Sequence, residues 1–216
     1  MEVSKKYSHV IWDWNGTLFN DVAWCMEVIN KMLVNRNITP LDSISAYQDV
    51  FCFPIIQYYK NLGFDFEKEP FEDLAKEYIN LYHSANSGNC KLHDDSKYLL
   101  ESIQDKNIKQ IILSASETSN LLSQISKFNI SHHFDEILGI SNIYAKSKVD
   151  IGLDYAARNG LENGVLIGDT QHDQEVAKAL GVDCLLVAAG HQSKKKLLTC
   201  GAPVLDSLSQ AIKYFH

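Results

Sequence analysis

The sequence predicts an α/β fold, a Rossmann-like doubly wound parallel sheet in a three-layer α/β/α arrangement with an all-helical insertion. Short β-branched runs alternate with amphipathic segments along most of the chain, as in doubly wound sheets. The apolar runs are continuous rather than alternating, which favours parallel strands covered on both faces. Only residues 20–89 break this alternation, because they hold several helical patterns and no convincing strand.

The expected elements follow in chain order. The first strand is SHVIW at residues 8–12, and the later ones are 109–113, 136–140, 164–167, 184–187 and 203–205. Helices are expected near residues 95–106, 117–128, 148–159 and 172–180. Gly181 stands where a glycine commonly ends a helix.

The insertion is placed directly after the first strand and its turn. Its clearest helical pattern has apolar residues from Phe71 to Tyr82 at helical spacing. Residues 86–89, Asn-Ser-Gly-Asn, read as a turn that closes it. We therefore expect a core built from residues 1–19 and 90–216, with residues 20–89 as a separate helical unit.

Composition narrows the possible partners. The 216 residues carry a formal net charge of −7, whereas binding nucleic acid needs a basic face, so no nucleic-acid partner is expected. No apolar run is long enough to cross a bilayer, and the sequence shows no signal peptide. We expect a cytoplasmic protein without a membrane partner, present as a monomer or homodimer.

Polar side chains follow three of the expected strands where each strand ends. Asp13 follows the first strand, Ser114 the second and Asp169 the fourth, and the segment 145–148, which holds two lysines, precedes the helix after the third strand. Ligands bind at the carboxyl ends of the strands in an open parallel sheet. We therefore expect these side chains to meet on one rim.

The residue types at that rim indicate phosphoryl transfer. Two carboxylates, Asp13 and Asp169, repel each other unless a cation lies between them. Hard oxygen ligands suit Mg²⁺, which also binds substrate phosphate. Asp13 could then attack phosphorus and form an aspartyl-phosphate, while Ser114, a lysine and backbone N–H groups hold the phosphoryl oxygens.

Four motifs occur in a fixed order: DWNGT at residues 13–17, LSAS at 113–116, the lysine pair, and GDTQHD at 168–173. Together they resemble the four sequence motifs of the haloacid dehalogenase superfamily. The resemblance covers the whole chain when the insertion is read as that family's C1 helical cap domain. By cap type and motif arrangement the chain is similar to phosphoglycolate phosphatase and its relatives. The resemblance implies a phosphatase, a phosphoric monoester hydrolase, that acts on a small phosphorylated metabolite.

The resemblance also implies a role for each matching residue. Asp13, Ser114 and Lys148 would be catalytic. The Mg²⁺ ligands would be Asp13, Asn15 through its backbone carbonyl, Asp169, and Asp173 by orienting metal-bound water. The substrate phosphate would contact Thr17, Ser114, Ala115 and Lys148. For the motif lysine, Lys148 is favoured because it directly precedes an amphipathic run, with Lys146 as the alternative.

Asn15 departs from the family pattern. Phosphatases of the family usually carry an Asp two residues after the nucleophile as general acid and base, and an amide cannot trade a proton at neutral pH. Three alternatives follow: a hydrolase limited to activated acyl or aryl phosphates, another proton donor such as His172 or a cap side chain, or a catalytically weak or inactive protein that binds a phosphate or a partner. The first alternative predicts that Asn15→Asp raises activity on alkyl phosphates far more than on acetyl phosphate.

Overall fold

The computed structural model describes residues 7–83, 90–140 and 147–215. Its centre is a six-stranded parallel sheet in the order β5-β4-β1-β6-β7-β8. The strands are β1 His9–Trp12, β4 Lys109–Glu117, β5 Glu136–Ile140, β6 Gly164–Gly168, β7 Asp183–Val187 and β8 Val204–Leu205. The predicted parallel sheet is therefore confirmed, and β1 is one of its inner strands.

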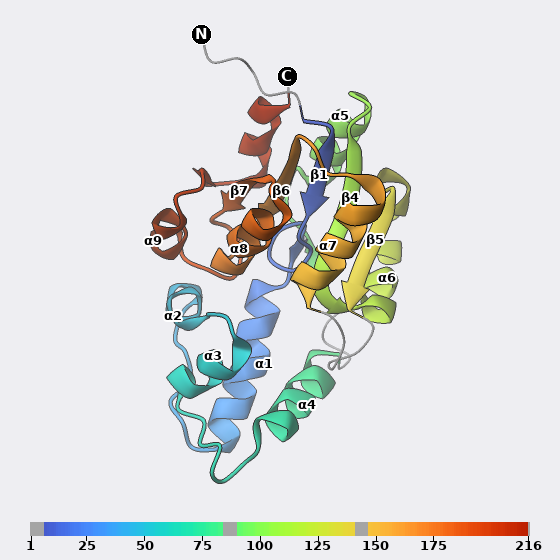
Figure 1. Cartoon of the computed structure of the whole chain (residues 1–216). Coiled ribbons are helices and arrows are strands. Elements are labelled where there is room, and N and C mark those ends of the chain that lie inside the picture. Colours follow the sequence, from blue (N-terminus) through green and yellow to red (C-terminus); the bar gives the residue numbers. More distant parts are fainter. Residues whose placement is uncertain (1–6, 84–89, 141–146, 216) are drawn as a thin grey trace.

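Helices cover both faces of the sheet, so the core has the expected three layers (Figure 1). On one face lie α7 Lys148–Asn159, α8 Gln171–Leu180 and the short α9 Lys194–Leu197. On the other lie α5 Ser96–Gln104, α6 Thr118–Lys127 and the 3₁₀ helix η4 Leu208–Tyr214. Two further 3₁₀ turns are η2 Ser131–His133 and η3 Leu198–Cys200.

Alternate residues of β1 supply the two apolar layers. Val10 and Trp12 belong to the cluster under α5 and α6, whereas Ile11 belongs to the cluster under α7 and α8. All three side chains are buried. Because a strand points successive side chains to opposite faces, apolar residues are needed at successive positions where both faces are buried. The apolar run Val10–Trp12 within the predicted strand 8–12 meets this need, and β1 begins one residue later than predicted, at His9.

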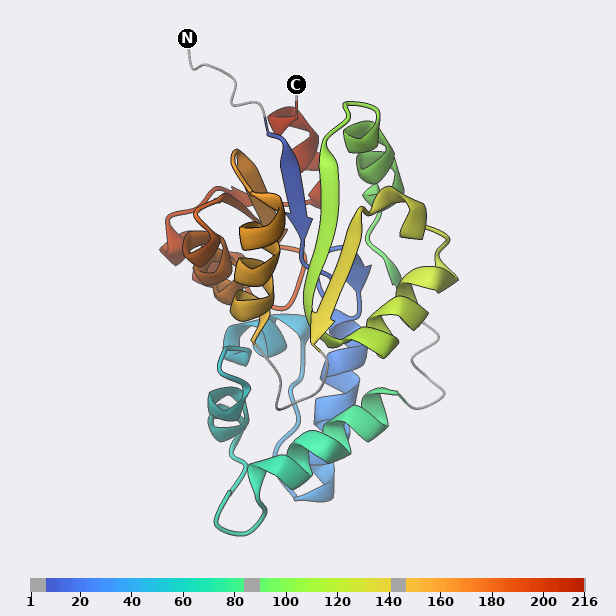
Figure 2. The same cartoon turned by 45° about the vertical axis from the view of Figure 1, so that its right-hand side comes forward.

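The four helices of the insertion form a separate unit beyond the carboxyl ends of the strands. They are α1 Val22–Asn35, α2 Ile44–Val50, α3 Ile55–Leu62 and α4 Phe71–Tyr82. In Figure 2 the arrowheads of β1 and β5 point toward this unit, which we call the cap. The cap has its own apolar core, which includes Val28, Met32, Tyr59 and Leu74.

A two-stranded ladder that the sequence did not predict joins the cap to the core. The strand β2 Phe19–Asn20 pairs antiparallel with β3 Lys91–Leu92. The chain therefore leaves the core and returns to it side by side. The limits of the cap at residues 20 and 89 stay a prediction, because residues 84–89 lie outside the described residues. Among the described helices, none combines the length and apolarity needed to cross a membrane.

One arginine connects two parts of the cap that are far apart in the sequence. Arg36, at the end of α1, donates hydrogen bonds from Nε and Nη2 to Glu69 (2.6 and 2.8 Å) and from Nη2 and Nη1 to Glu77 (2.6 and 3.3 Å). It also donates to the carbonyl oxygen of Met32 (3.0 Å). A planar guanidinium can satisfy two carboxylates in this way, and an ammonium cannot.

We expect Arg36→Lys to lower the free energy of unfolding by about 1 kcal/mol, because the charge remains while the paired geometry is lost. Urea unfolding measures the difference. The control is Arg158→Lys, because Arg158 is exposed and its ion pair to Glu136 is long, at 3.8 Å. A change within about 0.5 kcal/mol is expected there. Equal losses in the two variants would contradict the role given to Arg36.

Candidate active site

The position of Asp13, the predicted nucleophile, is fixed by the end of β1. Asp13 follows Trp12 directly, and its N–H donates to the carbonyl oxygen of Ile167 (2.9 Å), so the backbone continues the sheet pairing for one more residue. The Asp13 side chain is buried. Thr17 Oγ1 lies 3.1 Å from Asp13 Oδ2 and 3.0 Å from Asp169 Oδ1, and thus joins the ends of β1 and β6.

Lys148 contacts the Asp13 carboxylate at the oxygen that Thr17 does not contact. It is the first residue of α7, which begins with a capping box between Ser147 and Asp150. Its buried Nζ donates to Asp13 Oδ1 (2.5 Å) and Asp173 Oδ1 (2.6 Å). The structure thus brings the favoured lysine to Asp13, while Lys146 lies outside the described residues.

Asp173 is held by the start of its own helix. Thr170 and Asp173 form the capping box of α8, and Asp173 Oδ2 accepts from the Oγ1 of Thr170 (2.7 Å) and the N–H groups of Thr170 (3.0 Å) and Asp169 (3.2 Å). One oxygen of Asp173 is therefore used by the helix cap, and the other faces Lys148. This geometry is compatible both with a structural role for Asp173, as a capping residue of α8, and with its predicted role in the site.

Two glycines lie against the Asp169 carboxylate. A Cβ on Gly16 or on Gly190 would meet the Asp169 carboxylate. Gly16 also has φ +77, a conformation that an L side chain rarely adopts. The N–H of His191 donates to Asp169 Oδ2 (2.5 Å). The small residues on both sides thus allow the backbone to close around this carboxylate.

The electrostatics of the rim favour a bound cation. Carboxylate oxygens of Asp13, Asp169 and Asp173 lie within 4.8 Å of one another, and all three residues are buried. Lys148 supplies one positive charge against these three carboxylates. Burial raises the pKa of Asp13 and raises that of Asp169 well above its usual range, as expected for acids that lack a sufficient counter-charge.

The other two groups of this cluster stay charged. Burial opposes the charged form of Lys148, yet the charges of Asp13 and Asp173 raise the pKa of its ammonium above the usual value. Burial likewise opposes ionisation of Asp173, yet the Lys148 charge and the capping hydrogen bonds lower its pKa. A buried, oxygen-only set of three carboxylates is suited to a hard divalent cation such as Mg²⁺, so the residues present fit the expected cofactor.

The segment after the second predicted strand is irregular. β4 runs to Glu117, four residues beyond the expected end, and its register against β5 shifts between Leu113 and Glu117. Ser114 lies in this irregular stretch, buried, and its Oγ accepts from the N–H of Ser116 (3.0 Å). Among the described hydrogen bonds of the Asp13 carboxylate, the donors are Lys148 and Thr17 rather than Ser114. Ala115 is exposed, and the substrate roles of both residues stay predictions.

Asn15 has partners that sequence reasoning missed. Its Nδ2 donates to Asp21 Oδ2 (2.8 Å) and to the hydroxyl of Tyr82 (3.2 Å), and its Oδ1 accepts from Ser116 Oγ (2.7 Å). Asp21 precedes α1, and Tyr82 is the last residue of α4. An Asp before a helix is usually a cap, but the Asp21 side chain makes no cap hydrogen bond to α1. It points to the site instead.

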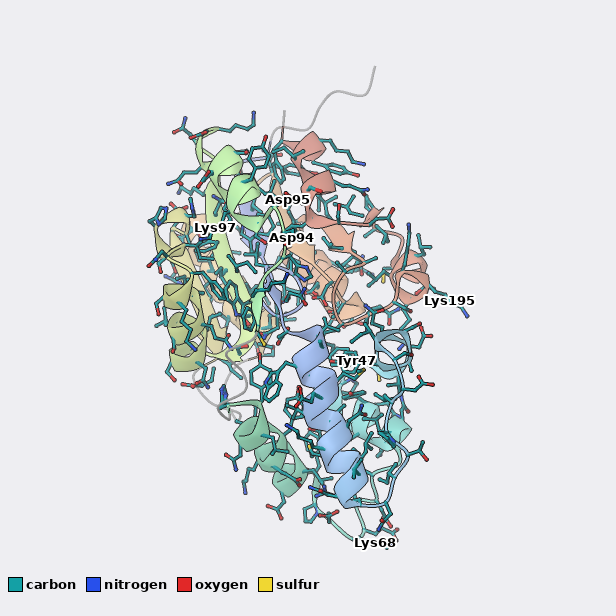
Figure 3. All side chains as sticks on the ribbon, turned by 180° about the vertical axis from the view of Figure 1, so that it is seen from behind. Tyr47, Lys68, Asp94, Asp95, Lys97 and Lys195 are labelled. Atoms are coloured by element: carbon teal, nitrogen blue, oxygen red, sulfur yellow. The ribbon has the colours of Figure 1, made fainter. Side chains whose placement is uncertain are left out.

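His191 was also missed, although the rule used for the other strand ends would have found it. It follows β7 by four residues, on the same rim of the sheet. Its Nε2 lies 3.2 Å from Asp21 Oδ1, and its Nδ1 lies 2.8 Å from the hydroxyl of Tyr47. Figure 3 shows Tyr47 at the end of the cap nearest the core, whereas Lys68 lies at the far tip. Cap and core therefore meet at this histidine.

The Asp21–His191 contact is a buried ion pair. Burial opposes the imidazolium, but the Asp21 charge and hydrogen bond raise the pKa of His191 to about 9. Burial also opposes the charged form of Asp21, yet the charge of His191 and hydrogen bonds from His191, Tyr82 and Asn15 lower the pKa of that carboxyl. Both groups are therefore charged at neutral pH.

These elements and this site agree with one protein family. A family model described as haloacid dehalogenase-like hydrolase matches residues 10–187. The match spans more than half of the chain, and the protein belongs to that family of hydrolases, as the motifs predicted. No curated protein matches the sequence.

Several solved structures share the fold over almost the whole chain. A haloacid dehalogenase-like hydrolase from Streptococcus pneumoniae has a TM-score of 0.82 at 19% identity, covering 97% of this chain and 99% of that one. A predicted phosphoglycolate phosphatase from Haemophilus somnus has a TM-score of 0.77 at 17% identity, covering 97% and 98%. Protein tyrosine kinase A from Mycobacterium tuberculosis has a TM-score of 0.81 at 20% identity, covering 98% and 99%. At these identities the likeness shows the fold alone.

We expect Lys148→Met to lower the free energy of unfolding by about 3 kcal/mol at pH 7 in EDTA, because two buried carboxylates lose their shared counter-charge. Urea unfolding measures the loss. The matched control is Lys97→Met, because Lys97 is an exposed lysine at the start of α5 (Figure 3). A loss no larger than that of the control would show that Lys148 does not hold the cluster together.

Proposed function

We propose that this protein is a Mg²⁺-dependent phosphatase that hydrolyses a small phosphorylated metabolite through an aspartyl-phosphate on Asp13. The observation that carries the proposal is the contact of Lys148 Nζ with Asp13 Oδ1 (2.5 Å) at the end of β1. An oriented carboxylate beside a fixed cation is what in-line attack on phosphorus needs. The family's hydrolase chemistry supports the same reaction.

In the first step a carboxylate oxygen of Asp13 attacks phosphorus and the bond to the leaving oxygen breaks. Lys148 holds the Asp13 carboxylate on one side, and the hydroxyl of Thr17 holds it on the other. In the second step water attacks the phosphorus of the aspartyl-phosphate, which releases inorganic phosphate and restores the Asp13 carboxylate. The lysine charge offsets the negative charge of the phosphoryl group in both steps.

Asp13, Asp169 and Asp173, with the backbone carbonyl of Asn15, would hold Mg²⁺. When bound, this ion would neutralise carboxylate and phosphoryl oxygens. Three buried carboxylates share the single charge of Lys148, and this incomplete compensation supports the assignment.

The leaving group limits the substrates in this proposal. The Asn15 amide is held by Asp21, Tyr82 and Ser116 and has no proton to give at neutral pH. Phosphates whose leaving group needs no protonation, such as acyl and aryl phosphates, are therefore expected to react faster than alkyl phosphates. The second candidate, a protein that binds phosphate without turnover, rests on the same amide.

We expect Mg²⁺-dependent phosphate release from acetyl phosphate and p-nitrophenyl phosphate, with a lower kcat/KM on phosphoglycolate. EDTA should abolish it, and Asp13→Asn should lower kcat at least about 10³-fold, because the amide cannot form the aspartyl-phosphate. Asp94→Asn, which makes the same change at an exposed position, is the matched control. Absence of turnover on all three substrates would favour the binding protein, and full activity of Asp13→Asn would exclude Asp13 as the nucleophile.

Metal binding can be tested without turnover. At a Mg²⁺ concentration about 100 times its Kd, binding to the folded state adds about 2.7 kcal/mol of stability, which raises the melting temperature of a chain of this size by about 5 °C or more. Asp169→Asn should lose most of this rise, and Asp94→Asn should keep it. If Asp169→Asn keeps the full rise, the metal is held elsewhere.

A further inference from the structure

The amide of Asn15 has one orientation that satisfies its neighbours. Its nitrogen lies 2.8 Å from Asp21 Oδ2, a carboxylate oxygen that can only accept, so this end of the amide must be the NH₂ group. The oxygen end then accepts from Ser116 Oγ (2.7 Å). Residue 15 is therefore an anchored donor toward Asp21, whichever reaction the site carries out.

Both oxygens of the Asp21 carboxylate are in turn occupied by hydrogen bonds. Asp21 is 1% exposed. Oδ2 accepts from Asn15 and from the hydroxyl of Tyr82 (2.7 Å), and Oδ1 accepts from the N–H of Gly16 (3.2 Å) and pairs with His191 Nε2 (3.2 Å). Two of these partners, Asn15 and Gly16, lie in the loop that follows the nucleophile.

Asp21 also reaches the other side of the site. His191, its ion-pair partner, donates its backbone N–H to Asp169 Oδ2. The same carboxylate thus orients residues beside Asp13 and beside Asp169. It lies between β2 and α1, where the chain passes from core to cap, and it receives the hydroxyl of Tyr82 from the last residue of α4.

The contact between residues 15 and 21 tolerates one negative charge and not two. If residue 15 were an Asp, a carboxylate oxygen would replace the donor that now lies 2.8 Å from Asp21 Oδ2. Two anions at hydrogen-bond distance in a buried site repel each other strongly. An Asp at position 15 would therefore be held protonated, with its proton committed to Asp21 Oδ2, and a proton free for a leaving group requires that position 21 give up its charge.

We propose that Asn15 and Asp21 are an exchanged amide–carboxylate pair, in which Asp21 is a positioning residue that holds Asn15, Gly16 and His191 in place beside Asp13 and Asp169 and connects them to the cap. The proposal rests on the phosphatase function proposed above. It reverses the expectation from sequence for Asn15→Asp: the single change lowers activity on every phosphate, alkyl phosphates included.

The test is a double-mutant cycle of Asn15→Asp and Asp21→Asn, with kcat and KM on acetyl phosphate and p-nitrophenyl phosphate. We expect each single change to lower kcat at least about 10-fold with KM within about 3-fold, because the reacting groups are misplaced while substrate contacts remain. The double variant, which exchanges the two residues and keeps the net charge, should return to within about 3-fold of wild type. Asp94→Asn is the control for a carboxylate-to-amide change.

Tyr82→Phe gives a second test without any change of charge. It removes the hydroxyl that joins α4 to Asp21 and Asn15. We expect kcat to fall about 3- to 10-fold, with a smaller loss of melting temperature than in either single variant of the cycle. Asn15→Asp as active as wild type, double-variant activity no better than the product of the two single losses, or an unchanged kcat in Tyr82→Phe would each overturn the proposal.

The melting temperature separates this proposal from the proposed function. Asn15→Asp and Asp21→Asn should each melt about 5 °C or more below wild type, and the double variant should recover most of that loss. If wild type releases phosphate from none of the substrates, the proposed function fails. The melting temperatures of this cycle still test whether Asn15 and Asp21 are an exchanged pair. Strictly additive losses of melting temperature would then overturn the exchange.

Discussion

The site depends on one buried ammonium group placed between two carboxylates. Lys148 reaches Asp13 and Asp173 at 2.5 and 2.6 Å. Asp13 directly follows β1, Lys148 is the first residue of α7, and Asp173 lies in the first turn of α8. A buried charge without partners is costly, so the end of β1 and the starts of α7 and α8 are constrained to meet at one point. The capping box of α8 holds the second oxygen of Asp173, and the capping box of α7, between Ser147 and Asp150, begins the helix that carries Lys148.

Most of the core could be predicted from sequence because its signals are local. The strand at residues 136–140 matches β5, and the helix at 148–159 matches α7, since a strand buried on both faces and a capped amphipathic helix have distinct patterns. β4 was predicted too short because Ser114, Ala115 and Ser116 do not continue the β-branched apolar pattern, yet they continue the strand to Glu117. The ladder of β2 and β3 was missed because a two-residue pairing across the whole insertion leaves no local pattern.

The candidate site was predictable only where chemistry coincides with a motif. Asp13, Thr17, Lys148, Asp169 and Asp173 meet as the strand-end rule implied. Asp21 and Tyr82 come together through the packing of the cap on the core, 61 residues apart in sequence, and no spacing rule relates them. Asn15 was recognised as unusual, but its meaning depends on these two neighbours, so sequence alone raised the question and left three answers open.

The paired strands β2 and β3 also bear on how such a protein can change over time. Phe19 lies opposite Leu92 and Asn20 opposite Lys91, so the two ends of the inserted segment are adjacent whatever lies between them. Closing a longer or shorter loop between fixed ends changes the free energy only slowly with its length. The inserted segment can therefore gain, lose or exchange helices beyond this ladder while the sheet and its register stay as they are.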